Sequence, residues 1–266
     1  MLALLKRNFL LYARNRSGVF FSLLGALISF LLYIIFLQKN LTDAWSQLPD
    51  NTSLLNNWLM GGTLAVTGIT TSFAALTQMV QDRENQVDQD LFLTDLGRWG
   101  LELSYLISSF VISFVMQVFM FIIMSLYFQE IPVMSHLLEI SLIMLLSSLL
   151  STLVNALLIY HFQSVDSLGK VATIIGTASG FLVGTYVPMG ILPNFAQLLM
   201  KCTPATYIAS LYRQVLMREQ LDSTFMGNNS LLEEFQEKLG VQIHWQELLT
   251  KEETYLIVVS ICLLTF

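Results

Sequence analysis

Long uncharged apolar stretches alternate with short polar segments along the chain. An α-helix needs roughly 20 apolar residues to cross the ~30 Å hydrocarbon core of a bilayer. Five stretches meet this length and predict membrane spans at about 18–37, 58–80, 103–128, 137–160 and 170–187. Glu139, near one end, is the carboxylate in their interiors, which hold no Lys or Arg. The pattern therefore predicts an all-α polytopic membrane protein.

A sixth apolar stretch begins at Thr254 and reaches Phe266 before it is long enough to cross a bilayer. We therefore expect a sixth span, 254–266 and beyond, that is incomplete in the given chain. The predicted fold is a single transmembrane domain over 1–266 with six transmembrane helices.

Two further segments have a helical pattern but are too short or too polar to cross the bilayer. Residues 1–16 place apolar positions on one face and Lys6, Arg7, Arg14 and Arg16 largely on the other, which predicts an amphipathic helix in the membrane interface. Residues 188–253 are divided by prolines into short pieces, typical of re-entrant, interfacial or external helices before the last span. Within them, a capping box of Ser230 and Glu233 predicts a helix over 230–250.

The basic residues set the expected orientation. The four cations before the first span exceed the single Lys39 in the loop after it, which favours a cytoplasmic N-terminus. Alternation of the spans then places 81–98 in the cytoplasm and the long 188–253 segment outside.

Composition narrows the class of protein further. Hydrophobic residues make up 55% of the chain and the mean hydropathy is +0.64, well above soluble proteins. A net charge of -6 argues against a nucleic-acid partner, since such surfaces are basic. Cys202 and Cys262 are too few for a disulfide framework and lack neighbouring metal ligands, so we expect no metal site.

Small and hydroxylated residues gather in two of the predicted spans. The second span is rich in them, and the fifth carries three glycines at four-residue intervals, which would align them on one helix face. Such residues allow close helix contact in lipid, and they also suit a substrate pathway. Both roles remain open for Thr63, Thr67, Thr71, Gly176, Gly180 and Gly184.

The predicted cytoplasmic segment 81–98 combines charges with a compact apolar cluster. This composition suits a short helix that docks on a soluble partner, with the charges fixing its register. Alternatively, the apolar cluster simply begins the third span. The residues expected to contact the partner are Asp82, Arg83, Glu84, Asp88, Asp90, Leu91, Phe92 and Leu96.

No catalytic motif stands out. A phosphate-binding G-x-x-x-x-G-K-[ST] loop is missing, and His136, His161 and His244 are predicted to lie apart, at different membrane faces. We therefore expect a noncatalytic chain. The spans also lack the central ionisable group that ion-coupled transport usually requires, so the energy source should lie in another subunit.

The basic start LLKRNFLLYARNRSG, the segment DRENQVDQDLFLTDLGRW and the stretch GILPNFAQLLMKCTPATYIASLYRQVL resemble an ABC-2 type transporter permease. The last stretch is the most specific, through Leu192-Pro193, the run from Pro204 to Tyr207, and Arg213. The resemblance implies two permease copies, with 81–98 as the coupling helix on an ABC ATPase present in two copies. ATP and Mg would bind that ATPase and not this chain.

The segment 81–98 departs from the family pattern, because Asn85–Asp90 and Asp95 replace residues that include a Gly-Thr-Glu run and a basic residue. We therefore expect a more basic docking groove on the ATPase.

The resulting hypothesis is an export permease in a bacterial plasma membrane, moving a hydrophobic or amphipathic compound such as a drug, peptide, toxin or lipid-like molecule. The alternatives are an ion-coupled secondary transporter and a membrane-anchored assembly or immunity protein that does not transport.

Overall fold

The computed structural model describes residues 1–48, 51–93, 97–129, 134–225 and 229–265. Within these ranges every regular element is a helix, beside one isolated bridge between His244 and Leu248. Four helical segments are long and apolar enough to cross a membrane: Arg16–Ala44, Asn51–Glu84, Gly97–Phe128 and His136–Ile159. The all-α membrane class is confirmed.

The first 159 residues hold these four segments. Its elements are α1 (Leu2–Arg14), α2 (Arg16–Leu32), the π-helix η1 (Tyr33–Leu37), α3 (Gln38–Ala44), α4 (Asn51–Glu84), α5 (Val87–Phe92), α6 (Gly97–Phe128) and α7 (Met134–Ile159). The described part of the chain after residue 159 is built from shorter helices. They are α8 (Val165–Leu182), the 3-10 helix η2 (Met189–Ile191), α9 (Asn194–Lys201), α10 (Pro204–Leu216), α11 (Arg218–Thr224), α12 (Asn229–Leu239) and α13 (Lys251–Thr265).

Helices α8 and α13 occupy the predicted fifth and sixth spans. They have 18 and 15 residues, and neither is among the four segments that meet the spanning criteria of length and apolarity. The count of six spans therefore remains a prediction.

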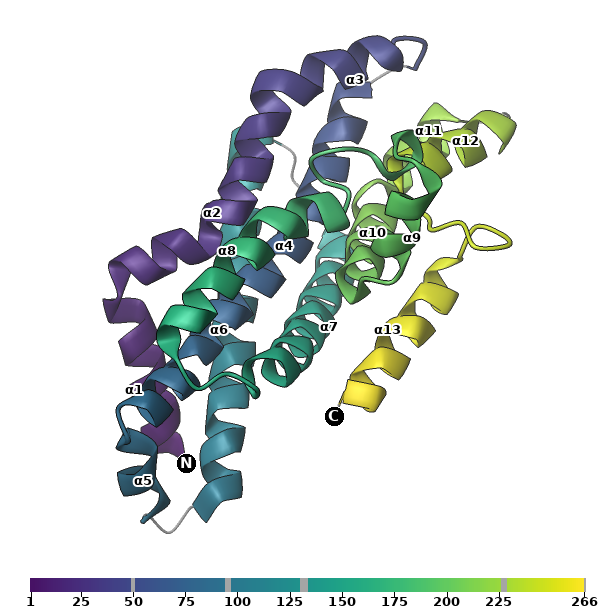
Figure 1. The fold of residues 1–266 in the computed structure, drawn as a ribbon. Helices are drawn as coiled ribbons and strands as arrows, with labels where there is room; N and C mark the ends of the chain where they lie inside the picture. The colour runs from purple at the N-terminus through teal and green to yellow at the C-terminus, as the bar shows by residue number, and fades with distance from the viewer. Residues whose placement is uncertain (49–50, 94–96, 130–133, 226–228, 266) are drawn as a thin grey trace.

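Helix α4 is the centre of the bundle (Figure 1). Its most apolar stretch is 83% buried, and it packs against α2, α6, α7, α8 and α10. Glycines permit these close approaches: an added Cβ at Gly61 would lie 3.0 Å from the backbone nitrogen of Arg213, and one at Gly68 would lie 2.8 Å from the Ser147 hydroxyl. The small residues of the second span thus allow the neighbouring helices to pack closely around α4.

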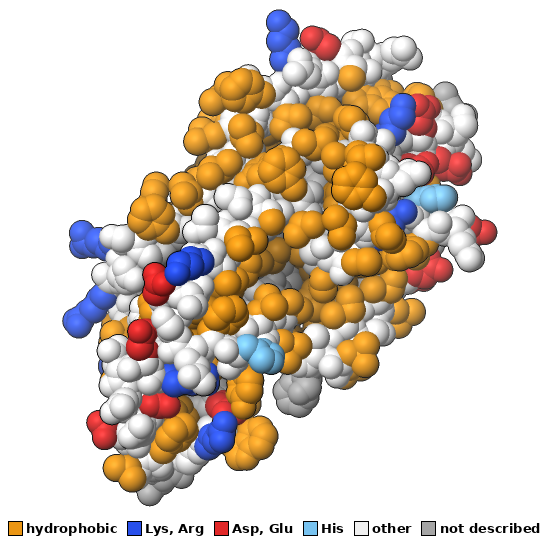
Figure 2. All heavy atoms as spheres, viewed as in Figure 1, with side chains coloured by type: hydrophobic (Ala, Val, Ile, Leu, Met, Phe, Trp, Pro, Cys, Tyr) orange, Lys and Arg blue, Asp and Glu red, His pale blue; other side chains and the backbone are white. Residues whose placement is uncertain are grey.

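The two ends of the bundle hold different elements. Helices α1 and α5 and the N-terminus lie together at one end, and α3, α11 and α12 lie at the other (Figure 1). Charged side chains gather towards these ends, whereas apolar side chains cover the middle of the visible face (Figure 2). This distribution is typical of a protein whose middle is in contact with lipid.

The segment 188–253 differs in two respects from its sequence-based description as external helices and loop. Helix α10 is buried inside the bundle, where Ile208 and Leu211 belong to the same core as residues of α4, α6 and α7. The helix predicted over 230–250 ends at Leu239, because Gly240 takes a left-handed conformation with φ of 62° that terminates it.

Candidate functional site

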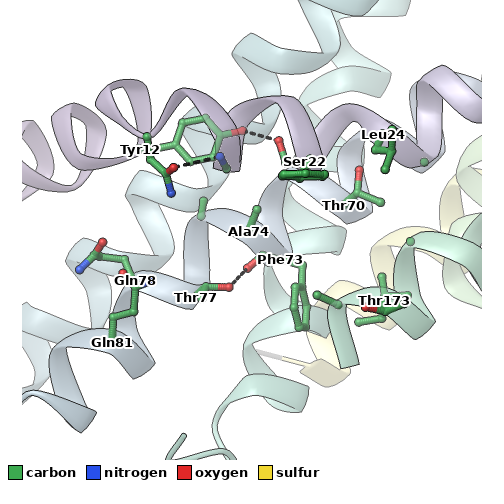
Figure 3. A pocket seen from close by; sticks show the side chains of 18 of the residues that line it. Tyr12, Ser22, Leu24, Thr70, Phe73, Ala74, Thr77, Gln78, Gln81 and Thr173 are labelled. Carbon is green, nitrogen blue, oxygen red and sulfur yellow. Dashed lines mark hydrogen bonds between the residues drawn. The ribbon is translucent and has the colours of Figure 1, made fainter. Parts of the chain in front are cut away.

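An open groove of about 550 Å³ runs between the α1–α2 segment on one side and α4 with α8 on the other (Figure 3). Along α4 its lining extends from Thr70 to Gln81, about 16 Å at the rise of an α-helix. Helix α1 ends at Arg14, and the Asn15 side chain accepts a hydrogen bond from the Gly18 N–H to begin α2. This junction between two helices forms one wall of the groove.

The lining of the groove is neutral and amphipathic. None of the lining residues, all of them in the described part of the chain, is charged. Aromatic and aliphatic side chains such as Phe21, Phe73 and Leu24 lie beside neutral polar ones. The polar members are Asn8, Tyr12, Asn15, Ser22, Thr70, Thr77, Gln78, Gln81, Thr173 and Thr177. A cavity of this size and polarity suits an organic molecule with an apolar body and a polar head.

The three threonines predicted for a pathway or a helix contact do not line this groove. Thr63, Thr67 and Thr71 are fully buried in α4. The hydroxyl of Thr67 donates to the Thr63 carbonyl, and that of Thr71 donates to the Thr67 carbonyl. The structure places them in helix contacts, whereas Thr70 and Thr77, on another face of the same helix, line the groove.

The predicted glycine row is only partly present. Gly176 lines the groove, and its carbonyl oxygen lies 3.0 Å from the position that a Cβ on Gly25 would take, so α2 and α8 meet closely there. Gly180 faces the ring of Tyr186. Gly184 lies beyond the end of α8 with φ of 69° and therefore does not share a helix face with the other two, which corrects the prediction.

The end of α4 carries three consecutive charges that contact different helices. The Asp82 carboxylate, 3% exposed, accepts two hydrogen bonds from Arg7 of α1 at 2.7 and 2.8 Å, and others from Gln78 and from Tyr105 of α6. Its hydrogen bonds to Asp82 raise the pKa of the Arg7 guanidinium above its usual value. Asp82 therefore joins α1, α4 and α6.

The next two charges, half-buried Arg83 and exposed Glu84, bind main-chain groups near the connection between α7 and α8. The Arg83 guanidinium donates to the main-chain carbonyls of Tyr160 and Phe162, just past the end of α7. The Glu84 carboxylate accepts a hydrogen bond of 2.8 Å from the N–H of Val165, the first residue of α8. We call Asp82, Arg83 and Glu84 the α4 end cluster.

Burial of Asp82 corrects the prediction that this residue contacts a partner, whereas for Arg83, which is half-buried, and Glu84, which is exposed, that contact stays a prediction. Successive residues in a helix project about 100° apart, so three neighbours reach three different elements. Asp82 is almost completely buried, and Arg83 and Glu84 hold the α7–α8 connection. They link helices within the chain.

Helix α5 carries the remaining residues of the predicted coupling segment. Asp88 and Asp90 lie in its first turn, and Leu91 packs against the core. Phe92 is 39% exposed and Leu93, which follows the helix, is 86% exposed. Leu96 lies outside the described residues. The alternative that the apolar cluster begins the third span is wrong for 91–93, since α6 begins at Gly97.

A cleft of about 630 Å³ lies beside α5. It is lined by both α5 and the start of α6, including Asp88, Phe92, Arg98 and Glu102, and Arg98 pairs with Glu102 at 3.1 Å. This end of the molecule thus presents an apolar edge flanked by charges.

The four cations predicted for the membrane interface divide into two groups. Lys6, Arg14 and Arg16 are exposed on α1 and at the start of α2. Arg7 instead turns inward to Asp82 and corrects the prediction for that position, because a carboxylate in the adjacent helix is a better partner than water or lipid.

Arg213 is a buried charged residue that the sequence analysis used only as part of a resemblance. Its side chain in α10 is fully buried and donates to the main-chain carbonyls of Trp58, Gly184 and Gly240, with longer contacts to those of Val183 and Leu239. The guanidinium keeps its charge at neutral pH, and these carbonyl oxygens solvate it in place of water. The sequence signal that could have indicated this buried position is a lone Arg in an otherwise apolar short helix.

Neutral polar contacts join the long helices inside the bundle. The Gln117 side chain of α6 donates to Ser148 of α7 at 2.8 Å and accepts from the Tyr212 hydroxyl of α10 at 2.7 Å. Nearer one end, Glu139 of α7 pairs with Lys251 of α13 at 2.6 Å. Interhelical hydrogen bonds of this kind hold helices together in lipid.

A helical bundle with four segments long and apolar enough to cross a bilayer defines the class of polytopic α-helical membrane proteins. Residues 1–217 match the family model described as ABC-2 type transporter. The match covers most of the 266 residues, so the chain belongs to the ABC-2 type transporter family. Members of this family are transporter permeases that generally work with an ABC ATPase. Comparison with curated proteins finds no match.

Proposed function

We propose that this chain is the noncatalytic membrane subunit of an ATP-driven exporter that moves a hydrophobic or amphipathic compound out of the cell. ATP and Mg bind a separate ATPase subunit, two permease copies assemble with two ATPase copies, and the N-terminus lies in the cytoplasm of a bacterial cell. The observation that carries this proposal is the connection between α5 and the groove through the α4 end cluster.

The mechanism follows from these contacts. The exposed apolar edge of α5, formed by Phe92 and Leu93, docks on the ATPase. Helix α5 follows α4 after two residues, so a displacement of α5 moves the end of α4. The α4 end cluster passes this displacement to α1, α6 and the α7–α8 connection.

The groove responds because its walls belong to the same helices. It is enclosed by the α1–α2 segment, α4 and α8. Rigid-body movement of these helices relative to each other changes the width of the groove and its access to either side of the membrane. Differential binding of ATP to the two states of the ATPase drives the cycle.

The test is affinity purification of the tagged chain from its own cells, followed by ATP-driven transport in reconstituted vesicles. An ATPase with a P-loop should copurify, and Leu93→Asp should abolish both copurification and ATP-driven transport. Asn85→Asp adds the same charge at an exposed position near α5 without changing the apolar edge, and it should behave as wild type. Transport powered by an ion gradient without an ATPase would refute the proposal.

A further inference from the structure

The acceptors to which the lining hydroxyl groups donate determine which hydrogen bonds the groove can offer a ligand. Four threonines line the groove, two on α4 and two on α8. Each donates its proton to a main-chain carbonyl one turn back in its own helix: Thr70 to Val66, Thr77 to Phe73, Thr173 to Gly169 and Thr177 to Thr173. The threonine oxygens can therefore accept a hydrogen bond from a ligand but have no proton left to donate.

The other two hydroxyls in the lining are committed in the same way. Ser22 donates to the Val19 carbonyl at 2.7 Å. The 2.8 Å contact between Tyr12 and Ser22 must then use the Tyr12 proton (Figure 3). All six hydroxyls of the groove thus present only acceptor lone pairs to its interior.

The amides of the lining add both acceptors and donors. One N–H of Gln78 donates to Asp82 and one N–H of Asn8 donates to Ser108, so each of these NH2 groups keeps a second N–H. The Gln78 carbonyl oxygen is available as an acceptor, whereas the Asn8 oxygen accepts from Arg7. The N–H groups of Asn15 and Gln81 have no protein acceptor among the described contacts. Asn15 lies at the α1–α2 junction, and Gln81 lies three residues before the end of α4.

We propose that the groove binds amphipathic molecules whose polar head donates hydrogen bonds, such as an alcohol or an amine, and excludes those with a carboxylate or phosphate head. This inference rests on the proposed function, since it names the chemical class of the exported compound. An anionic head would lose its hydration and meet six hydroxyl oxygens that only accept hydrogen bonds, while the amide N–H groups of the lining are neutral and no cation is present to compensate the charge.

The test uses two fluorescent probes that differ only in the head, dansylaminoundecanol and dansylaminoundecanoic acid. The full chain is placed in phosphatidylcholine nanodiscs, and binding is titrated at about pH 9, where the acid is ionised even though the bilayer raises its pKa above the value in water. Titration of empty nanodiscs corrects for partition into lipid. The alcohol should bind at least about tenfold more tightly than the acid, because the acid must bury an unpaired charge.

Two sets of variants link this preference to the groove. Thr77→Val combined with Thr173→Val removes two acceptors at nearly constant volume and should reduce the preference to about threefold or less. Thr71→Val is the matched control, because Thr71 makes the same bond to its own helix but is fully buried outside the groove.

The second set fills the groove. A Cβ added at Gly176 meets nothing within 4 Å, so Gly176→Leu should fold and project into the groove, weakening alcohol binding at least about tenfold. Gly169→Leu is its control in the same helix, since Gly169 is equally open but does not line the groove.

Three results would overturn the inference: equal or tighter binding of the acid, an unchanged preference in the double threonine variant, or wild-type binding by Gly176→Leu. These results are independent of the ATPase. A retained preference for the alcohol, with no ATPase copurifying and no ATP-driven transport, would reject the export function and leave the assigned head-group chemistry in place.

Discussion

Arg7 and Asp82 lie 75 positions apart in the sequence and form a two-point ion pair, with the carboxylate almost completely buried. The pair fixes helix α1, at the end of the bundle that carries α5, to the end of the central helix α4. A displacement of α5 that moves the end of α4 would act on this joint.

Arg7→Met should destabilise the folded chain by about 2 kcal/mol, because it leaves the Asp82 carboxylate buried with fewer partners; partial exposure of Arg7 reduces the full cost. Unfolding in detergent, followed by circular dichroism, measures this loss. Arg14→Met, at an exposed position in the same helix, should have no effect. Equal stabilities of the two variants would show that the pair contributes nothing.

Glu84→Ala should loosen the start of α8 by about 1 kcal/mol, since it removes the carboxylate that accepts from the Val165 N–H. Hydrogen exchange of the amides at 165–168 should become several-fold faster. Asp166→Ala removes an exposed carboxylate from the same turn that pairs with Lys170, and it should leave the exchange of Val165 unchanged. Unaltered exchange in Glu84→Ala would count against the link between α4 and α8.

Arg213→Met should destabilise the chain by at least about 3 kcal/mol, because several main-chain carbonyls in three separate segments lose their donor inside the bundle. Thermal unfolding in detergent is the measurement, and Arg218→Met, at an exposed position in α11, is the control. A fully stable Arg213→Met variant would contradict the assigned structural role.

Gly62→Ala should destabilise the chain by about 1 to 3 kcal/mol, since the added methyl group meets the Thr185 hydroxyl and the Arg213 guanidinium. Gly169→Ala, in open space within α8, should instead stabilise it by up to about 1 kcal/mol through its helix propensity. Opposite shifts in the melting temperatures of the two variants check both expectations, and shifts of the same sign would contradict them.

The apolar pattern predicted the positions of the long helices well, because burial in lipid demands length and apolarity that are visible residue by residue. It placed the second span at 58–80, although α4 extends from Asn51 to Glu84, since polar helical turns beyond the apolar stretch leave no such signature. The helical segment near 87–92 was also foreseen, through its charges around an apolar cluster.

The contacts between helices could not be foreseen in the same way. Nothing local in the sequence indicates that Asp82 faces Arg7, or that Arg213 reaches carbonyls of three separate segments. Likewise, the four-residue spacing of Gly176, Gly180 and Gly184 suggested one face, but the helix ends at Leu182. Spacing predicts a shared face only where the helix continues.

The absence of Lys and Arg from the described lining of the groove has a consequence for the membrane around it. Phospholipids are the most concentrated amphiphiles near any integral protein, and each carries a phosphate. Under the proposed preference, a cleft that offers these headgroups no counter-charge binds surrounding phospholipids weakly. Scarcer amphiphiles with a neutral or cationic head then compete successfully for it.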